Sequence, residues 1–355
     1  MEKLLPSSSN EEFLDHSYRY FFSREPDAEG RAYFAGEMAR GMTREAVLQA
    51  FLGSDEFARR FNGKNEFAGQ LSPAQRFAPE GHFYSPIPAA QDYREHFQAL
   101  SLADPDAVAV NEATQLEFAG KFSATYGELP FPKDRSEQYR YYLNNGAFNY
   151  FDGIVLYSMI REFKPKRIIE VGSGYSSAAM IDTCETFLEG KTEITFIEPY
   201  PATLHKCLLP RDEGRYRIID QNVQQVDLAV FQELEKNDIL FIDSSHVAKF
   251  GSDVNHLLFK VLPLLNDGVV VHFHDIFKNF DYPQEWLTEG RAWNEAYLLK
   301  AFLAHNKNFR ILFFNDWFAD RHWDYLEKNL PLCTVQPEGS PFKNCGVSLW
   351  LQYCA

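Results

Sequence analysis

The 355-residue chain lacks any apolar run close to the roughly 20 residues that a membrane-spanning helix needs. Its first segment, Met1 to Asn10, has neither a long apolar core nor a small-residue cleavage site, so no secretion signal is predicted. The five cysteines are odd in number and form no C-x-x-C pair, which favours reduced thiols over a disulfide framework. These absences predict a cytoplasmic protein without a membrane span.

Positive charge is also scarce. The chain has 35 Lys and Arg against 50 Asp and Glu, which gives a net charge of −15 and a pI near 5.2. Nucleic acids and anionic membranes are bound by basic surfaces, so neither is expected as a partner. Hydrophobic residues make up 45% and aromatic residues 15% of the chain, which indicates a densely packed globular protein.

The stretch from Lys166 to Pro201 carries the clearest signal. An apolar run, 168–171, breaks into the turn Gly172-Ser173-Gly174, as a parallel strand does where it passes into a helix. About 25 residues later a second apolar run ends in Glu198, and a carboxylate at a strand tip can accept both hydroxyls of a ribose. The third glycine of the dinucleotide fingerprint is missing, so a pyrophosphate is not indicated.

These two motifs resemble the first two motifs of class I S-adenosylmethionine-dependent methyltransferases. The resemblance implies S-adenosylmethionine as the cofactor, with its methionine part beside the glycine turn and its ribose at Glu198. It also implies a polar contact to adenine after the third strand, for which we expect Gln224. The residues expected to bind the cofactor are Glu170, Gly172, Ser173, Gly174, Glu198, Gln224, Asp243 and Ser244.

Seven apolar segments have the spacing of strands in a doubly wound sheet, and helical patterns separate most of them. The sheet of class I methyltransferases also has seven strands, the last of them inserted antiparallel. We therefore predict an α/β fold with a seven-stranded, doubly wound, Rossmann-like methyltransferase sheet and a small all-α N-terminal domain. The predicted strands are 167–171, 194–197, 216–219, 239–242, 269–273, 310–314 and 347–351.

Two of these strands end in acids and imidazoles. Asp243 ends the fourth strand, with His246 three residues later, and the fifth runs into His274 and Asp275. Polar groups at the tips of apolar strands are costly unless they are used. In one interpretation Asp243, His274 and Asp275 hold a divalent cation, and His246 is the general base for a substrate hydroxyl. In the other, the same groups hydrogen-bond one another and shape the cofactor pocket without a metal.

The run from Ile242 to Ile276 is similar to a bacterial branch of class I that includes sugar O-methyltransferases. In its metal-dependent relatives the position of Asp243 binds magnesium, two adjacent acids follow the fifth strand, and the position of His246 supplies the base. Here His274 replaces the first of those acids, which weakens the case for magnesium because magnesium prefers oxygen ligands. The resemblance implies O-methylation of a hydroxyl on a sugar, glycan or secondary metabolite, with Asp275 and Asp243 orienting that hydroxyl.

The N-terminal part has apolar residues at helical spacing, with breaks at Pro26 and Gly41. The string from Arg24 to Phe57 resembles a helical domain of unknown function that is related to phycobilisome-linker modules, and this implies docking to a protein partner. The predicted organisation is a flexible tail at 1–10, a helical domain at 11–64, an ordered connector or arm at 65–105 and a class I methyltransferase domain at 106–355.

The segment after the fifth strand is rich in aromatic residues. Trp286, Arg291 and Trp293 suit a wall of the acceptor site, a dimer contact or simple core packing. Arg291 and Glu295 have the i, i+4 spacing of a pair on a helix surface.

Two other functions remain open at this point. The first is a non-catalytic docking module in which the nucleoside fold is a relic. The second is an oxygenase that uses Asp243, His246, His274 and Asp275 to hold iron. A homo-oligomer is left open as well.

Overall fold

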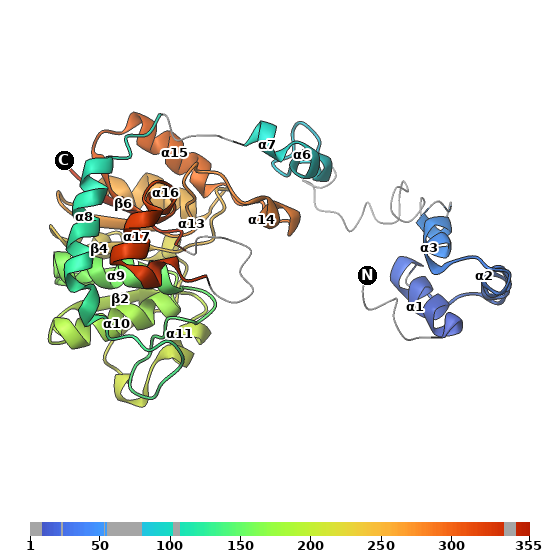
Figure 1. Cartoon of the computed structure of the whole chain (residues 1–355), viewed down its shortest axis with the longest axis horizontal. Helices are drawn as coiled ribbons and strands as arrows, with labels where there is room; N and C mark the ends of the chain where they lie inside the picture. Colours follow the sequence, from blue (N-terminus) through green and yellow to red (C-terminus); the bar gives the residue numbers. More distant parts are fainter. Residues whose placement is uncertain (1–8, 23, 53, 55–79, 102–106, 337–345) are drawn as a thin grey trace. The chain divides into compact units, whose positions relative to one another are not determined.

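The computed structural model describes residues 9–22, 24–52, 54, 80–101, 107–336 and 346–355 (Figure 1). The chain divides into two compact units, Met1–Ala89 and Ala90–Ala355. This division falls within 65–105, the stretch that the sequence assigns to a connector, and the sequence-based domain boundaries stay a prediction.

The smaller unit is helical in its described part. Helix α1 spans Asn10–Phe22, α2 spans Ala28–Ala39 and α3 spans Arg44–Leu52. A small core that includes Phe13, Tyr18 and Phe51 holds these helices together, and the ring of Tyr18 packs edge-on against that of Phe51 at 4.8 Å. Asp27 caps α2 by accepting a hydrogen bond from the Gly30 N–H at 2.7 Å, as expected of an acid before a helix. Residues 55–64, the last part of the predicted helical domain, lie outside the described residues.

The larger unit contains a seven-stranded sheet with the order β3-β2-β1-β4-β5-β7-β6. Strand β7 pairs antiparallel with both β5 and β6, and the other pairs are parallel. The predicted seven-stranded sheet with an antiparallel last strand is therefore confirmed. The strands are β1 Arg167–Val171, β2 Glu193–Ile197, β3 Arg217–Ile219, β4 Ile239–Ile242, β5 Val270–Phe273, β6 Phe309–Phe314 and β7 Leu349–Tyr353.

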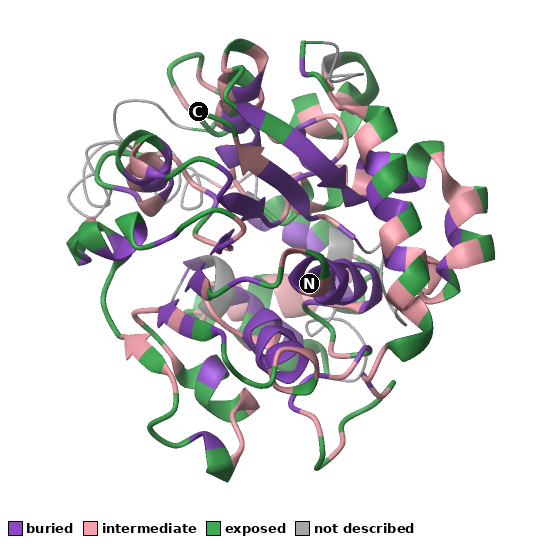
Figure 2. Ribbon diagram, turned by 90° about the vertical axis from the view of Figure 1, so that its left-hand side faces the viewer, coloured by how far each residue is buried: buried purple, intermediate pink, exposed green. Residues whose placement is uncertain are grey.

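Helices cover both faces of this sheet, so the central strands are buried on both sides (Figure 2). Side chains alternate along each strand: Ile168 of β1 joins the core under one layer of helices, and Ile169 joins the core under the other. The described α-helices of this unit are α6 Ala90–Glu95, α7 Phe97–Leu100, α8 Glu112–Thr125, α9 Tyr150–Phe163, α10 Tyr175–Phe187, α11 Ala202–Cys207, α12 Ala229–Gln232, α13 Asp253–His256, α14 Gln284–Thr288, α15 Glu295–His305, α16 Asn315–Arg321 and α17 Trp323–Asn329.

The helical pattern that separates the fourth and fifth strands, residues 254–265, forms three short pieces in the structure. Helix α13 ends at His256, a π-helical turn covers Leu257–Val261, and a 3₁₀ turn covers Leu262–Leu264. Pro263 lies in the last turn and has no N–H to donate, which accounts for the change from regular helix there. Within the described ranges, no helix is both long and apolar enough to cross a membrane.

The tips of β1 and β4 lie unusually close together. Gly172, directly after β1, has a φ of 82°, and a Cβ atom there would collide with the backbone carbonyl oxygen of Asp243. The Asp243 N–H in turn donates to the carbonyl of Val171 at 2.9 Å. Only glycine combines this backbone conformation with so close an approach, so Gly172 sets the spacing of the two loops that follow β1 and β4.

We expect Gly172→Ala to lower the thermal unfolding midpoint of the larger unit. The positive φ and the collision should together cost about 2–4 kcal/mol. The control is Gly120→Ala in α8, where a Cβ meets nothing within 4 Å. Because alanine is a better helix former, that change should be neutral or stabilising by up to about 1 kcal/mol. Circular dichroism melts of the two variants test this, and equal midpoints would contradict the argument.

Candidate active site

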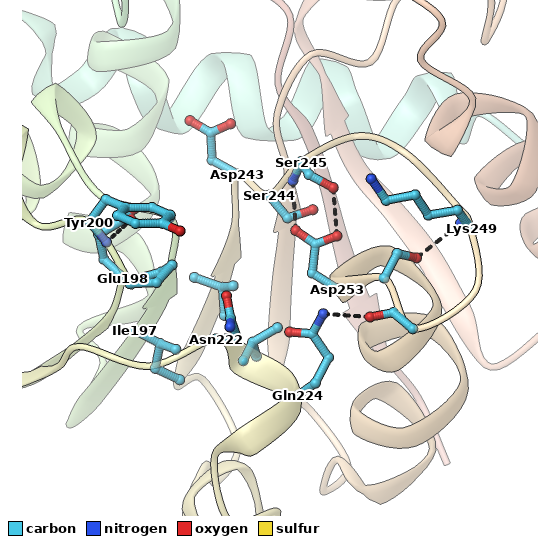
Figure 3. Close-up of a pocket in the computed structure, with 16 residues that line it drawn as sticks. Ile197, Glu198, Tyr200, Asn222, Gln224, Asp243, Ser244, Ser245, Lys249 and Asp253 are labelled. Carbon is cyan, nitrogen blue, oxygen red and sulfur yellow. Dashed lines mark hydrogen bonds between the residues drawn. The ribbon is translucent and has the colours of Figure 1, made fainter. Parts of the chain in front are cut away.

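A cavity of about 380 Å³ opens where β1, β2 and β4 end (Figure 3). This is the position at which doubly wound sheets bind their ligands. The cavity is lined by five of the eight residues that the sequence assigns to the cofactor, together with Asn222, Tyr200, Lys249 and Asp253 among others. These five are Gly172, Glu198, Gln224, Asp243 and Ser244.

The backbone around Glu198 fixes its carboxylate in place. The Ser173 N–H donates to Oε2 at 3.1 Å, and the Tyr200 N–H donates to Oε1 at 2.8 Å. Each oxygen keeps a second lone pair, so the carboxylate can still accept bonds from two hydroxyl groups. Figure 3 shows Glu198 and Tyr200 on one wall of the cavity and Gln224 on the other.

The opposite wall is tied to the loop after β4. The side-chain amide of Gln224 donates to the Gly251 carbonyl at 2.8 Å, so its orientation is fixed. Asp253 accepts bonds from the Ser245 N–H at 2.8 Å and the Ser245 hydroxyl at 2.6 Å. The N-cap of α13 is Ser252, whose hydroxyl accepts from the Asn255 N–H. Asp253 therefore orders the cavity wall.

Two serine hydroxyls at this site have no protein partner. The Oγ atoms of Ser173 and Ser244 are buried and make no hydrogen bond within the described part of the chain. Buried polar groups are nearly always paired, so both hydroxyls are available to a ligand. Together with the glycine cradle and the carboxylate of Glu198, they fit a nucleoside cofactor that carries additional polar groups.

The other two residues expected at the cofactor are Glu170, in β1, and Gly174, in the glycine turn itself. Glu170 is fully buried and accepts bonds from the hydroxyls of Ser176 and Ser177, both at 2.5 Å. Burial raises the pKa of Glu170 to about 8, although the two serine hydroxyls oppose the increase. Gly174 donates its N–H to the Ser177 hydroxyl at 3.0 Å. Glu170 and Gly174 thus order the turn and do not line the cavity.

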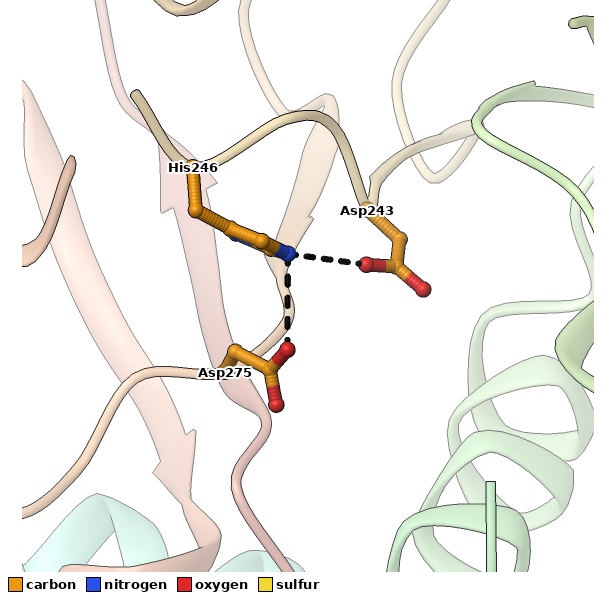
Figure 4. A group of neighbouring side chains, drawn as sticks. All are labelled: Asp243, His246 and Asp275. Carbon is orange, nitrogen blue, oxygen red and sulfur yellow. Dashed lines mark ion pairs between the residues drawn. The ribbon is translucent and has the colours of Figure 1, made fainter. Parts of the chain in front are cut away.

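His246 lies between two carboxylates at the edge of this cavity (Figure 4). Its Nε2 is 3.3 Å from Asp243 Oδ1 and 3.4 Å from Asp275 Oδ2, while Nδ1 is 2.9 Å from Glu295 Oε2. Burial would lower the pKa of His246, but the bonds to Asp243 and Glu295 and the charge of Asp275 raise it well above 6.5. One imidazole thus interacts with three carboxylates.

The two carboxylates at Nε2 differ in their environments. Burial would raise the pKa of Asp243, but the charge of His274 and the bond from His246 bring it below its ordinary value. Burial dominates at Asp275 and raises its pKa, although both histidines oppose the increase. Because 34% of the Asp243 side chain is exposed, compared with 16% for Asp275, Asp243 is the more accessible of the two.

The start of α15 holds His246 in place. The His246 residue has a φ of 59°, and its carbonyl accepts from the N–H groups of Asn294 at 3.0 Å and Glu295 at 3.1 Å. Asn294 also accepts from the Ala248 N–H at 2.6 Å, and the ring of Trp293 lies 4.4 Å from the imidazole. Residues 293–295 therefore fix both the backbone and the ring of His246.

The sequence-based interpretation of Glu295 as a surface partner of Arg291 is wrong. Glu295 is 1% exposed and bonds to His246, whereas Arg291 pairs with Glu289 at 2.8 Å. The available signal was an acid in the first turn of an otherwise apolar helix. Helical spacing alone could not show that this turn lies against the tip of β4.

The structure does not bring together the metal ligands expected from the sequence. The described residues that could converge on a cation are Asp243, His246 and Asp275, whose ligand atoms lie within 4.8 Å of one another, and His274 is outside this group. The ring of His274 packs 5.2 Å from that of Phe148, and its Nε2 lies 3.7 Å from Asp275 Oδ1. Two carboxylates and an imidazole fit magnesium poorly, and the two-histidine set expected for iron is not formed either.

Aromatic side chains adjoin the imidazole. The rings of Trp286 and Trp293 lie 5.0 Å apart, and the guanidinium of Arg291 lies 4.3 Å from the ring of Trp286 and 5.0 Å from that of Trp293. This places the aromatic segment beside His246. Its role as an acceptor wall stays a prediction.

The strand order, the antiparallel β7 and the acid at the tip of β2 define the class I methyltransferase fold. Residues 169–276 match a family described as methyltransferase domain, and the chain belongs to this family of class I S-adenosylmethionine-dependent methyltransferases. Residues 2–61 match a domain of unknown function, DUF4214, which confirms the predicted N-terminal domain.

An uncharacterized protein from Archaeoglobus fulgidus is 36% identical over 171 residues, which is 45% of this chain and 75% of the relative. Among solved structures, the S-adenosylhomocysteine-bound methyltransferase PaMTH1 of Podospora anserina is 17% identical, with a TM-score of 0.37. The match covers 68% of this chain and 88% of that one. The O-methyltransferase TomG of Streptomyces achromogenes, in complex with S-adenosylmethionine, is 14% identical over 80% of this chain and 100% of its own, with a TM-score of 0.37. These structural likenesses are too distant to assign a substrate or a residue's role.

Glu295→Gln should lower the pKa of His246 because it removes one of the three carboxylate charges around the imidazole. A raised histidine pKa contributes stability below the unfolded-state value of 6.5, and this contribution is lost as the pH rises through the folded-state value. The wild type should therefore exceed the variant in stability most clearly at low pH. NMR titration of the imidazole measures the shift, with Glu289→Gln as the control. An unchanged His246 pKa in Glu295→Gln would contradict this account.

Proposed function

We propose that this protein transfers a methyl group from S-adenosylmethionine to a hydroxyl of a small-molecule or glycan acceptor, with His246 as the general base. The observation that carries the proposal is the position of Asp243. This residue lines the nucleoside-sized cavity and also lies 3.3 Å from the imidazole of His246. The cofactor site and the proposed base are therefore adjacent.

The residues of the cavity have distinct parts in holding the cofactor. Glu198, already oriented by two backbone N–H groups, would accept the two ribose hydroxyls. Gln224 and Asn222 on the opposite side offer amide groups to the adenine edge. The unpaired hydroxyls of Ser173 and Ser244 supply further donors. When bound, S-adenosylmethionine supplies an electrophilic methyl group, so the protein's task is to align a nucleophile and remove its proton.

The surroundings of the His246 imidazole suit it to remove the proton of the nucleophile. Glu295 accepts the Nδ1–H of His246, which leaves Nε2 as the atom that faces Asp243 and Asp275. In its neutral form Nε2 can take the proton of an acceptor hydroxyl that the two carboxylates orient. Because the surrounding carboxylates raise the pKa of His246, we expect the transfer rate to increase with pH above 6.5.

The acceptor would lie on the aromatic side of the imidazole. Trp286 and Trp293 offer faces on which a sugar or planar ring can stack, and Arg291 is held against both. The choice of a hydroxylated acceptor follows the sequence resemblance to sugar O-methyltransferases. We further propose a cytoplasmic location and, for residues 11–64, docking to a protein partner.

Neither alternative function gains support from the site. An iron-dependent oxygenase would need the second histidine, and His274 lies outside the group formed by Asp243, His246 and Asp275. A relic fold would not require Glu198 to keep both oxygens oriented, nor Ser173 and Ser244 to point unpaired hydroxyls into buried space. Methyl transfer accounts for these features best.

We expect His246→Ala to abolish methyl transfer without changing the affinity for S-adenosylhomocysteine. Loss of a general base typically lowers the rate about 10²–10⁴-fold. The assay follows labelled methyl from S-adenosylmethionine into a panel of sugar hydroxyl acceptors, and calorimetry measures cofactor binding. His305→Ala, an exposed histidine at the end of α15, is the control. Equal turnover in His246→Ala and the wild type would remove His246 from the mechanism.

A further inference from the structure

A second and larger cavity, of about 550 Å³, lies on the other side of the glycine turn. Its wall is formed by residues 135–142, by Tyr175 at the start of α10, and by α11 with the residues that follow it. It shares no lining residue with the nucleoside cavity. The methyl-transfer account assigns no role to this space.

The two cavities are nevertheless neighbours. Gly172 lines the first and Tyr175 lines the second, so a three-residue step of the chain separates their walls. Thr203, which also lines the second cavity, has its methyl group 3.5 Å from the position of a Cβ on Gly174. The glycine turn is therefore a thin partition between them.

Two cations face the second cavity without a carboxylate partner. Arg135 and Lys206 both line it, and neither forms an ion pair within the described part of the chain. Arg140, which also lines it, is buried and already paired with Asp182, Glu185 and Asp212.

Arg135 is exposed, and its charge acts on two groups that line the cavity. The bond with the Tyr142 hydroxyl and burial raise the pKa of the Tyr175 phenol to about 12, and the positive charge of Arg135 opposes this increase. It likewise opposes the rise in the pKa of the Cys207 thiol, which burial and the charge of Glu170 bring to about 11. Both Arg135 and Lys206 are exposed, so a ligand from solvent can reach their charges.

Three tyrosines also line this cavity, together with the carboxylate of Glu137 and the residues 207–210. The rings of Tyr142 and Tyr175 meet edge to face at 5.8 Å, and their hydroxyl oxygens are 3.4 Å apart. Tyr139 lines the same space. Aromatic faces with phenolic hydroxyls suit a hydroxylated ring, while a guanidinium and an ammonium suit a phosphate or carboxylate.

We propose that this cavity binds a small anionic ligand, a phosphate or carboxylate carried on a hydroxylated ring, independently of the nucleoside cavity. Arg135 and Lys206 contact the anionic group, and Tyr142 and Tyr175 pack on the ring. The proposal does not depend on methyl transfer or on the identity of the acceptor.

Calorimetric titration with glucose 6-phosphate and with glucuronate tests the proposal, and glucose is the neutral control. The full chain is titrated with and without saturating S-adenosylhomocysteine, so that ligands of the first cavity are distinguished from those of the second. We expect at least one anionic probe to bind saturably in both conditions and glucose not to bind. Arg135→Gln and Lys206→Gln should each weaken that binding about tenfold or more.

The matched control is Lys133→Gln, which removes an exposed cation from the same segment without altering the cavity lining. It should change the affinity less than twofold. Equal weakening by Lys133→Gln would show an effect of overall charge and overturn the proposal. Absence of binding by both anionic probes at millimolar concentration would overturn it as well. The proposal would also be overturned if S-adenosylhomocysteine competed with the anionic probes and bound Arg135→Gln more weakly than the wild type. The cavity would then belong to the cofactor.

Discussion

The close approach of two strand tips is the constraint on which the site depends. A left-handed glycine after β1 lets the Asp243 carbonyl pack against the backbone of Gly172. As a result, the turn that forms one cavity wall touches the loop that carries Asp243 and His246. A side chain at Gly172 would separate the two, and the cofactor site and the proposed base would lose their common residue. Backbone sterics, more than any single polar contact, thus determine the arrangement.

The site also depends on the carboxylates that surround the imidazole of His246. Three carboxylates, from Asp243, Asp275 and Glu295, surround one imidazole, and α15 fixes the position of both its backbone and its ring. The carboxylates favour the protonated ring, so the neutral form that the proposed mechanism requires is populated at higher pH. If His246 is the general base, as proposed, the cluster that positions it also limits the pH range in which it can act.

The strands were predictable because buried parallel strands are continuous apolar runs, and the glycines and the acid at the strand tips come next in the sequence. Contacts between residues far apart in the sequence were not predictable in this way. Glu295 lies 49 residues from His246, and no local pattern connects residues so far apart. Its i, i+4 spacing to Arg291 suggested a pair on a helix surface instead. His274 follows its strand as a ligand would, but its ring packs against Phe148 and it lies outside the group formed by Asp243, His246 and Asp275. Local pattern thus predicted the fold and five of the residues that line the cavity at the strand ends, whereas the partners of His246 required the tertiary structure.

The most direct test of this account is calorimetric titration with S-adenosylhomocysteine, on the wild type and on Glu198→Ala. Glu193→Ala, at the exposed opposite end of β2, is the matched control. The account predicts micromolar binding to the wild type and the control, and at least about tenfold weaker binding to Glu198→Ala, a loss of about 1.4 kcal/mol. Absence of binding to the wild type, or equal binding to all three proteins, would contradict the assignment of the cavity.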